Sequence, residues 1–443
     1  MGVVPADEPE GSDNRTVIDL LIRNATLDGT DRLDFVVDGG FIIDRGPALN
    51  YFATQEYDLA GRLLIPGFVE SHVHLDIALM NPWDKPGRPE PYRSISALNE
   101  SLEHRRRSFT QQEIVARAGK ALELASRHGV TALRAQCHVD PEVGLSHLEA
   151  LLEVKQMYAD LVSLQIVAFP QQGFLCNPDT RALFQEAFRM GADVMGCASN
   201  LDRDARGRVD FRSHIDAVFA LAAELDVDID IHADLGIPQQ VELEDLEVVH
   251  AARRTIEYGY QGRVTAGHVC ALDSALPDVA AQAIEWICKA GISVVSQPDL
   301  YRLGREDRHH VRRGLTRVKE LLAAGVNVTY ASNNVRDAMR PLGNFDLLEE
   351  GLILAYGAHM DTVEQLENLL RMSTYNAAKA LRLEGYGLEP GCRADMVILD
   401  APSPSAAIVS QAEKNYVFKA GHLVAANRVV SETPHRSARQ WKT

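Results

Sequence analysis

Two histidines one residue apart, His72 and His74, follow an apolar run that begins at Leu63. If this segment is a strand, its side chains alternate between two faces, so both imidazoles point to one side and can share a metal ion. With 15 histidines in 443 residues, such a pair also arises by chance. The apolar run and the Pro66-Gly67 turn that lead into the pair favour a metal site over that structural accident.

The middle of the chain alternates apolar segments with amphipathic stretches such as 112–128 and 211–225. Repeated units of a strand followed by a helix make a closed parallel barrel the economical architecture. We therefore predict an α/β fold, a (β/α)8 TIM-like barrel that spans residues 66–380. Its strands are expected at 67–75, 130–138, 162–169, 193–197, 227–232, 264–268, 293–296 and 326–331.

Both ends of the chain show a pattern of short strands broken by turns, with Asp38-Gly39-Gly40 as a hairpin signal. Strands are expected at 17–22, 34–37, 41–43, 394–400, 416–424 and 429–430. Residues 17–65 and 381–432 are therefore predicted to form one small composite β-sandwich domain. Residues 1–16 are predicted to be a disordered tail.

Polar residues gather where the predicted barrel strands end, and barrel enzymes carry out their chemistry at the C-terminal ends of their strands. A single histidine at a strand end is more often a core residue, but five at the same end of one barrel are hard to explain in that way. The residues at these ends are His72, His74, His138, Asp140, Gln171, His232, Asp234, His268, Asn333 and Asn334.

The composition excludes several classes of protein. A formal net charge of −17 argues against partners such as nucleic acid or an anionic membrane surface. No apolar run approaches the roughly 18 residues that span a bilayer, and the N-terminus does not resemble a signal peptide, so we expect a cytoplasmic protein. The six cysteines form no Cys-x-x-Cys pair, which favours reduced thiols over disulfides or a cysteine zinc site. We also expect a homo-oligomer.

Several motifs make the chain resemble the amidohydrolase superfamily, in the branch of bacterial cytosine deaminase and N-isopropylammelide isopropylaminohydrolase. The similarity runs from about residue 17 to about residue 425 and is most specific at 66–76, 131–140, 164–173, 262–268, 312–325, 333–343 and 391–397. It implies a metal-dependent hydrolase that acts on a C–N bond of a small N-heterocycle, such as a pyrimidine or a triazine. One divalent ion is implied, with zinc or iron favoured and manganese or cobalt as alternatives.

The resemblance also implies roles for individual residues. His72, His74 and His232 would be metal ligands, and Asn333 occupies the position of the last ligand. His268 would lie beside the attacking water, and Gln171 would bind the ring amide of the substrate. His138 and Asp337 are further candidates for substrate contacts. From loop position alone, the mouth of the site is expected to include Asp299, Tyr301, Arg302, Arg336 and Met339, with a solvated rim as the alternative for each charged residue.

Two positions depart from the family pattern at the reacting centre. Asn333 replaces the usual Asp, and Leu235 replaces the Glu that shuttles protons. An amide oxygen can ligate a metal, but it cannot accept a proton in the working pH range. Together with Met339, where cytosine deaminase has a Trp, Leu235 argues against cytosine itself as the substrate.

Three interpretations follow from these departures. The enzyme is active with another base, namely His268, Asp234 or Asp337; or Asn333 is an engineered replacement of Asp; or the chain is a ligand-binding homologue with impaired catalysis. For an active enzyme, ring opening of a cyclic amide or ureide is the alternative to removal of an exocyclic amine.

Overall fold

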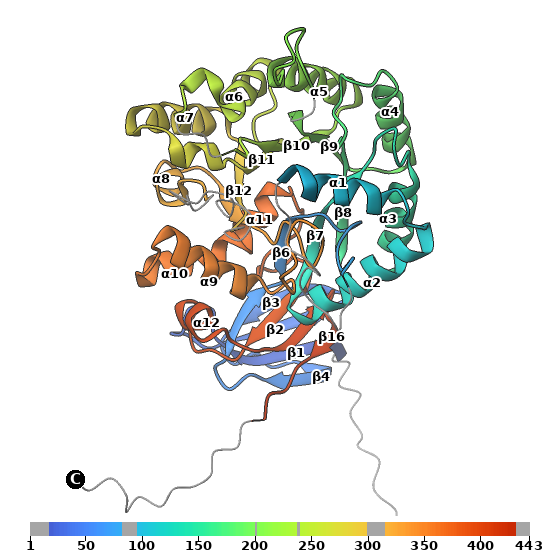
Figure 1. Cartoon of the computed structure of the whole chain (residues 1–443). Coiled ribbons are helices and arrows are strands. Elements are labelled where there is room, and N and C mark those ends of the chain that lie inside the picture. The colour runs from blue at the N-terminus through green and yellow to red at the C-terminus, as the bar shows by residue number, and fades with distance from the viewer. Residues whose placement is uncertain (1–16, 82–94, 200–201, 237–239, 299–314, 431–443) are drawn as a thin grey trace, which may run out of the picture.

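The computed structural model describes residues 17–81, 95–199, 202–236, 240–298 and 315–430, and its central feature is a barrel of parallel strands (Figure 1). Neighbouring strands pair in chain order from β6 to β13. A parallel bridge between Val73 and Asn333 joins the first strand to the segment after the last. The strands are β6 (Phe68–Val73), β7 (Val130–His138), β8 (Ser163–Phe169), β9 (Val194–Cys197), β10 (Asp228–Ala233), β11 (Val264–His268), β12 (Ser293–Ser296) and β13 (Val328–Tyr330). The predicted fold class is confirmed.

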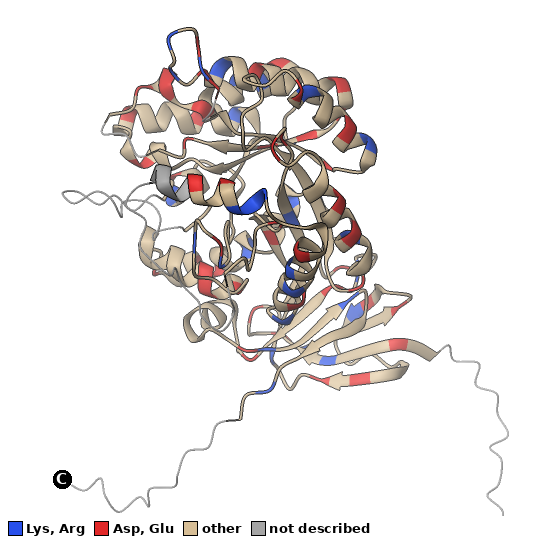
Figure 2. Ribbon diagram, turned by 45° about the vertical axis from the view of Figure 1, so that its right-hand side comes forward, with Lys and Arg blue, Asp and Glu red and all other residues tan. Residues whose placement is uncertain are grey.

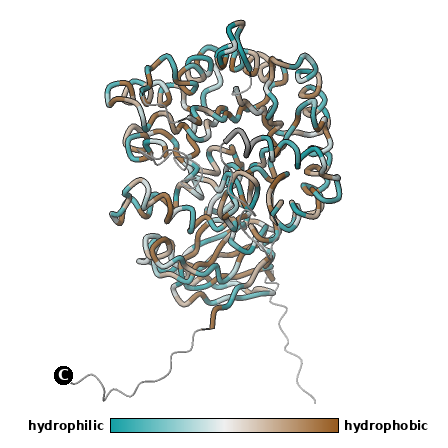
Figure 3. The backbone as a smooth tube through the Cα atoms, viewed as in Figure 1, coloured by the Kyte–Doolittle hydropathy of each residue, from teal (hydrophilic) through white to brown (hydrophobic). Residues whose placement is uncertain are grey.

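Helices surround the barrel and bury their apolar faces against its strands. The alternation of brown and teal along the helical turns in Figure 3 reflects this amphipathic pattern. Helix α2 illustrates the local signals, because Thr110 and Glu113 form a reciprocal capping box at its start. The helices are α1 (Ile95–Arg106), α2 (Gln111–Arg127), α3 (Ser146–Met157), α4 (Thr180–Met190), α5 (Phe211–Leu225), α6 (Glu247–Tyr258), α7 (Pro277–Ala290), α8 (Val318–Ala323), α9 (Leu347–Ala358), α10 (Val363–Met372), α11 (Tyr375–Ala380) and α12 (Pro404–Ser410).

Two four-stranded sheets from the chain ends share a second apolar core. One sheet has the order β3-β2-β1-β4, and the other has the order β16-β15-β14-β5. Strand β5 of the N-terminal part pairs antiparallel with β14 of the C-terminal part, so both ends of the chain build this unit. The strands are β1 (Val17–Ala25), β2 (Leu33–Asp38), β3 (Phe41–Gly46), β4 (Phe52–Asp58), β5 (Leu63–Pro66), β14 (Met396–Leu399), β15 (Lys414–Lys419) and β16 (His422–Ala426).

Several local predictions for this unit can be compared with the structure. Gly39 and Gly40 form the expected hairpin turn, with φ of 57° and 83°. The single strand expected at 416–424 is two strands separated by a turn, and the strand expected at 429–430 is wrong. Val429 and Val430 are exposed and lie outside any strand. The exact domain boundaries stay predictions, and the predicted tail at 1–16 lies outside the described residues.

The junction between the sheets and the barrel is tightly packed. A Cβ atom at Gly67, between β5 and β6, would lie 2.1 Å from Oγ1 of Thr131, so only glycine fits there. Lys419 of β15 is buried and donates to the Thr131 carbonyl at 2.8 Å, to Ser163 Oγ at 2.8 Å and to the Asp395 carboxylate at 2.6 Å. This ammonium therefore ties the second sheet to strands β7 and β8.

Acidic residues are spread along the outer helices with basic ones interspersed among them, as the red and blue segments of the ribbon in Figure 2 show. In the part of the chain that the structure describes, no helix is both long and apolar enough to cross a bilayer. The cytoplasmic location and the homo-oligomeric state stay predictions.

Replacing Lys419 with methionine should destabilise the fold by about 3–5 kcal/mol, because the Asp395 carboxylate would lose its buried counter-charge. Urea unfolding followed by tryptophan fluorescence measures this difference. The control is Arg62→Met, which breaks an exposed pair with Asp400 and should cost no more than about 1 kcal/mol. Equal destabilisation by both variants would contradict the anchoring role of Lys419.

Candidate active site

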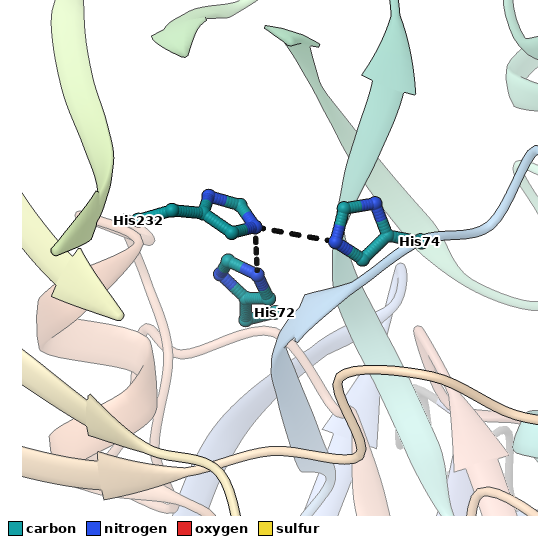
Figure 4. Close-up of side chains that lie close together, drawn as sticks. All are labelled: His72, His74 and His232. Atoms are coloured by element: carbon teal, nitrogen blue, oxygen red, sulfur yellow. Dashed lines mark hydrogen bonds between the residues drawn. The ribbon is translucent and has the colours of Figure 1, made fainter. Parts of the chain in front are cut away.

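Three histidine side chains converge at the carboxyl ends of β6 and β10 (Figure 4). Nε2 of His232 lies 3.2 Å from Nε2 of His72 and 3.2 Å from Nε2 of His74. All three side chains are buried, with exposed fractions of 0%, 8% and 5% for His72, His74 and His232. Nitrogen ligands about 2.1 Å from one divalent ion stand roughly 3.0–3.4 Å apart, so this spacing fits a shared metal.

Three polar side chains inside the barrel, those of Arg134, Gln136 and Asp230, form a column below His72 and orient its imidazole. Nδ1 of His72 lies 3.3 Å from Oδ1 of Asp230 and 3.2 Å from the Gln136 amide nitrogen. The Arg134 guanidinium lies 3.2 Å from the other Asp230 oxygen. Burial alone raises the pKa of Asp230, but His72 and Arg134 hold it below its ordinary value. A carboxylate that accepts the Nδ1 proton leaves the Nε2 lone pair of His72 for a metal.

Sequence analysis missed this column, although the strand period contains the signal. Asp230 precedes His232 by two residues, and Gln136 precedes His138 by two. Residues two apart on a strand share a face, so each polar residue lies one layer below a site histidine inside the barrel. The sequence-based prediction covered only the residues at the strand ends and did not include this layer of polar side chains below them.

The backbone of Asn333 closes the barrel between His72, in β6, and His74, just after it. Its N–H donates to the His72 carbonyl at 3.0 Å, and its carbonyl accepts from the His74 N–H at 2.9 Å. The residue has a left-handed φ of 59° and is 1% exposed. Neither atom of its side-chain amide has a hydrogen-bond partner among the described residues, so the amide is available to a metal or a substrate.

A cavity of about 70 Å³ opens above these groups. The lining residues are His74, Ile77, Leu102, His138, Phe169, Gln171, Ala198, His232, Leu235, His268, Asn333, Asn334 and Met339. The structure thus brings the predicted residues Gln171, His138, His268 and Asn333 to the histidine cluster.

His138 is held by a buried carboxylate. Asp76 Oδ2 accepts from Nδ1 of His138 at 2.7 Å, from the His138 N–H at 3.0 Å and from Nδ1 of His147 at 2.7 Å. Because a backbone N–H donates to the same oxygen, we interpret this second acidic and histidine cluster as a hydrogen-bond network rather than a metal site. Nε2 of His138 has no hydrogen-bond partner among the described residues and lies at the cavity.

His268 stands at the end of β11, with its ring centroid 5.1 Å from that of His232 and 5.8 Å from that of His72. Its φ of 71° is left-handed, an uncommon backbone for a non-glycine residue that is concentrated at functional sites. Leu235 also lines the cavity and presents an aliphatic side chain. The structure therefore has an apolar group near the centre where the family pattern has a carboxylate.

Two predicted site carboxylates do not line the cavity. Asp234 accepts from the backbone N–H groups of Glu247 at 2.8 Å and Val248 at 3.1 Å, and so it caps the start of α6. Burial, with the charge of Glu247, raises the pKa of Asp234. Asp337 accepts from the Met339 N–H at 2.8 Å and from the Asn334 amide at 2.6 Å. Because these oxygens are engaged elsewhere, the geometry does not support Asp234 as the base or Asp337 as a substrate contact.

The predicted mouth residues divide into three groups. Asp299, Tyr301 and Arg302 lie outside the described residues. Met339 lines the cavity as expected. Arg336 is not among the lining residues, and its guanidinium donates to the Gly343 carbonyl at 3.0 Å.

The fold and the site together define a (β/α)8-barrel enzyme with a histidine cluster at the carboxyl ends of its strands. The model of the Amidohydrolase family matches residues 95–431. An N-isopropylammelide isopropyl amidohydrolase of Pseudomonas sp. (strain ADP) is 31% identical over 421 residues, which cover 93% of this chain and 98% of the relative. A pterin deaminase of Rhizobium rhizogenes is 29% identical over 409 residues, with coverage of 90% and 89%.

Among solved structures, 5-methylcytosine deaminase from Klebsiella pneumoniae liganded with phosphonocytosine is 31% identical and has a TM-score of 0.84. The match covers 94% of this chain and 100% of that structure. The chain belongs to the Amidohydrolase family and is an enzyme of the class that acts on carbon–nitrogen bonds. The branch of the superfamily predicted from the sequence is confirmed.

Replacing Asp230 with asparagine should weaken metal binding about 10- to 100-fold, since the carboxylate that orients His72 is lost. Competition with a chromophoric chelator measures the affinity, and chelation should lower the melting temperature of the wild type. The control is Asp228→Asn on the same strand, because Asp228 bonds Arg263 and Arg382 instead of a histidine. Equal metal affinity in both variants and the wild type would contradict this role for Asp230.

Proposed function

We propose that the protein hydrolyses a C–N bond of a small nitrogen heterocycle and releases an amine or ammonia. The observation that carries the proposal is the convergence of three imidazoles, with Nε2 of His232 3.2 Å from Nε2 of both His72 and His74, at a small cavity lined by the amide of Asn333. The names of the relatives support it, since they describe hydrolases or deaminases of a substituted triazine, a pterin and a cytosine.

The lining of the cavity suits the polar edge of a nitrogen heterocycle. The Gln171 side chain offers both donors and an acceptor, which suits the N–H and C=O groups on the edge of a ring amide. Nε2 of His138 supplies a further polar contact at the cavity.

His72, His74 and His232 would hold the divalent ion, and Asn333 offers an amide oxygen as a further ligand. Imidazole ligands suit zinc and iron, with manganese and cobalt as alternatives. When bound, such an ion acts as a Lewis acid and lowers the pKa of water. Asp230 orients His72 for this purpose, and Phe169 packs against His232 with ring centroids 4.4 Å apart.

The chain must also move protons without the usual carboxylates. Overall, the oxygen of water bonds to the ring carbon, the C–N bond breaks, and the nitrogen leaves with a proton. Asn333 and Leu235 cannot carry that proton, whereas the imidazole of His268 can exchange one near neutral pH. We assign His268 the transfer to the leaving nitrogen, because its ring lies beside those of His72 and His232.

The test is turnover of a panel of amino-substituted pyrimidines and triazines by purified, metal-loaded protein, with cyclic amides and ureides included. His268→Asn should lower the turnover of the best substrate by about 10²–10⁴-fold while metal content stays unchanged. Hydrolysis of only the cyclic amides would assign ring opening instead. Tight binding of panel compounds without any turnover would identify a ligand-binding homologue.

The variant Asn333→Asp, which puts a carboxylate at this position, distinguishes an enzyme whose Asp was replaced from an enzyme built around Asn333. In an enzyme whose Asp was replaced, the variant should tighten metal binding and raise turnover at least about tenfold, since a charged ligand and a proton acceptor return. In an enzyme built around Asn333, metal affinity should rise while turnover stays level or falls. Metal titration and steady-state kinetics on the same preparations measure both quantities.

A further inference from the structure

The last residue of β7, His138, lines the cavity with a ring whose two nitrogens have different surroundings. Nδ1 lies 2.7 Å from Oδ2 of Asp76, whereas Nε2 has no hydrogen-bond partner among the described residues. The side chain is 1% exposed. A buried nitrogen that stays unpaired costs free energy, so Nε2 is the atom whose bonding a ligand can complete. Whether Nε2 carries a proton decides which ligands can do so.

Asp76 determines which nitrogen of His138 carries the proton. Its Oδ2 atom accepts from the backbone N–H of His138 at 3.0 Å and lies 2.7 Å from Nδ1 of both His138 and His147. Three nitrogens around one oxygen leave no place for a proton on that oxygen, so Nδ1 of His138 donates to it. If the ring is neutral, Nε2 is then a hydrogen-bond acceptor.

His147 supplies the positive charge that balances the Asp76 carboxylate. Its Nδ1 faces Oδ2 of Asp76, and its Nε2 lies 3.3 Å from the Arg106 carbonyl oxygen. Both partners are acceptors, so each ring nitrogen of His147 donates and the ring is an imidazolium. His147 is 1% exposed, and a second, unbalanced cation at His138 would be costly in so buried a place. His138 is therefore neutral, with a proton on Nδ1 and a lone pair on Nε2.

Neighbouring rings keep the imidazole of His138 from turning over. Those of Phe169 and His147 meet it nearly edge-on, with centroids 5.7 and 5.8 Å away and interplanar angles of 79° and 80°. The N–H of Val139 donates to the Phe169 carbonyl at 3.0 Å, which holds the end of β7 against β8. A flip of the ring would also break its hydrogen bond with Asp76. The acceptor is thus preformed, and a ligand need not spend binding energy on ordering it.

We infer that His138 is a fixed hydrogen-bond acceptor that selects heterocycles with an N–H donor on the edge that faces β7. The inference rests on the proposed function and adds a rule for its substrates. Gln171, which follows the neighbouring strand β8, can turn its amide to meet a donor or an acceptor, but His138 offers only a lone pair. A ring oxygen or an unprotonated ring nitrogen at this place would set two lone pairs against each other and leave both unpaired. Such a mismatch costs about 10- to 100-fold in affinity.

Matched ligand pairs test the inference. Each pair consists of a small oxo-heterocycle with a ring N–H and the same ring with oxygen in place of that N–H, and successive pairs move the replacement around the ring. These ligands have no exocyclic nitrogen to release, so calorimetry measures their affinity for the metal-loaded protein. Amino-substituted members of the same series measure kcat/KM in parallel.

The variants are His138→Gln and His138→Leu, with His250→Gln as the matched control. His250 is likewise bonded to a carboxylate, with Nε2 2.7 Å from Oδ1 of Asp216, but it does not line the cavity. Nitrogen NMR of histidine-labelled, zinc-loaded protein measures the tautomer of His138 directly, and the signal that disappears in His138→Gln identifies this residue. The tautomer measurement depends neither on turnover nor on the folding of a variant at Asp76.

In the wild type and in His250→Gln, the N–H ligand should bind about 10- to 100-fold more tightly than its oxygen analogue at one ring position. His138→Gln should bind that oxygen analogue more tightly than the wild type does, because its amide can donate. His138→Leu should reduce the preference to about threefold or less, because the acceptor is lost. The NMR signals should show a proton on Nδ1 of His138 and none on Nε2.

Turnover without a donor preference at any ring position would overturn the inference while the proposed function stands. The same holds for a proton on Nε2 of His138, or for an equal preference in His138→Leu and His250→Gln. Donor preference without turnover of any amino-substituted member would support the inference and contradict the proposed function. Absence of binding by every ligand would overturn both.

Discussion

Closure of the barrel is the constraint on which the rest of this structure depends. The parallel strands share one direction, so their carboxyl ends meet at one rim, and a parallel bridge between Val73 and Asn333 joins the first strand to the segment after the last. The hydrogen bonds that Asn333 makes with the backbone of His72 and His74 complete the ring. The same bonds place the Asn333 amide beside two of the three converging histidines. The same hydrogen bonds therefore close the barrel and position a residue of the candidate metal centre.

Polar side chains also fill the interior of the barrel below His72. Instead of a purely apolar filling, it contains the Arg134, Gln136 and Asp230 side chains, linked to one another and to His72. A buried carboxylate of this kind is costly unless it is paired and hydrogen-bonded, and here each of its oxygens has partners. The column keeps the imidazole of His72 in one orientation, because it links that ring to side chains packed in the barrel core.

The cavity lies above this column, and the residues that line it determine which groups can carry protons there. Asn333 and Leu235 stand at the two positions where the resemblance to the family implies carboxylates, and the nearby carboxylates of Asp234 and Asp337 hold a helix start and a loop. Histidine imidazoles are thus the groups at the cavity that can exchange protons near neutral pH, among the residues that the structure describes.

The sequence alone determined the barrel, the contribution of both chain ends to the outer sheets, and the pairing of His72 with His74, because strand and helix periods are local properties of the chain. It also predicted that His232, His268 and Gln171 lie near them, since parallel strands end at one rim. Only the tertiary structure decided which polar side chains turn toward that rim. Asp234 and Asp337 satisfy backbone N–H groups, while Asp230 and Asp76 hold the rings of His72 and His138, and Leu102 lines the cavity. The reason is physical: a side chain adjacent to a strand end in sequence can point in several directions, and long-range packing and hydrogen bonding select one.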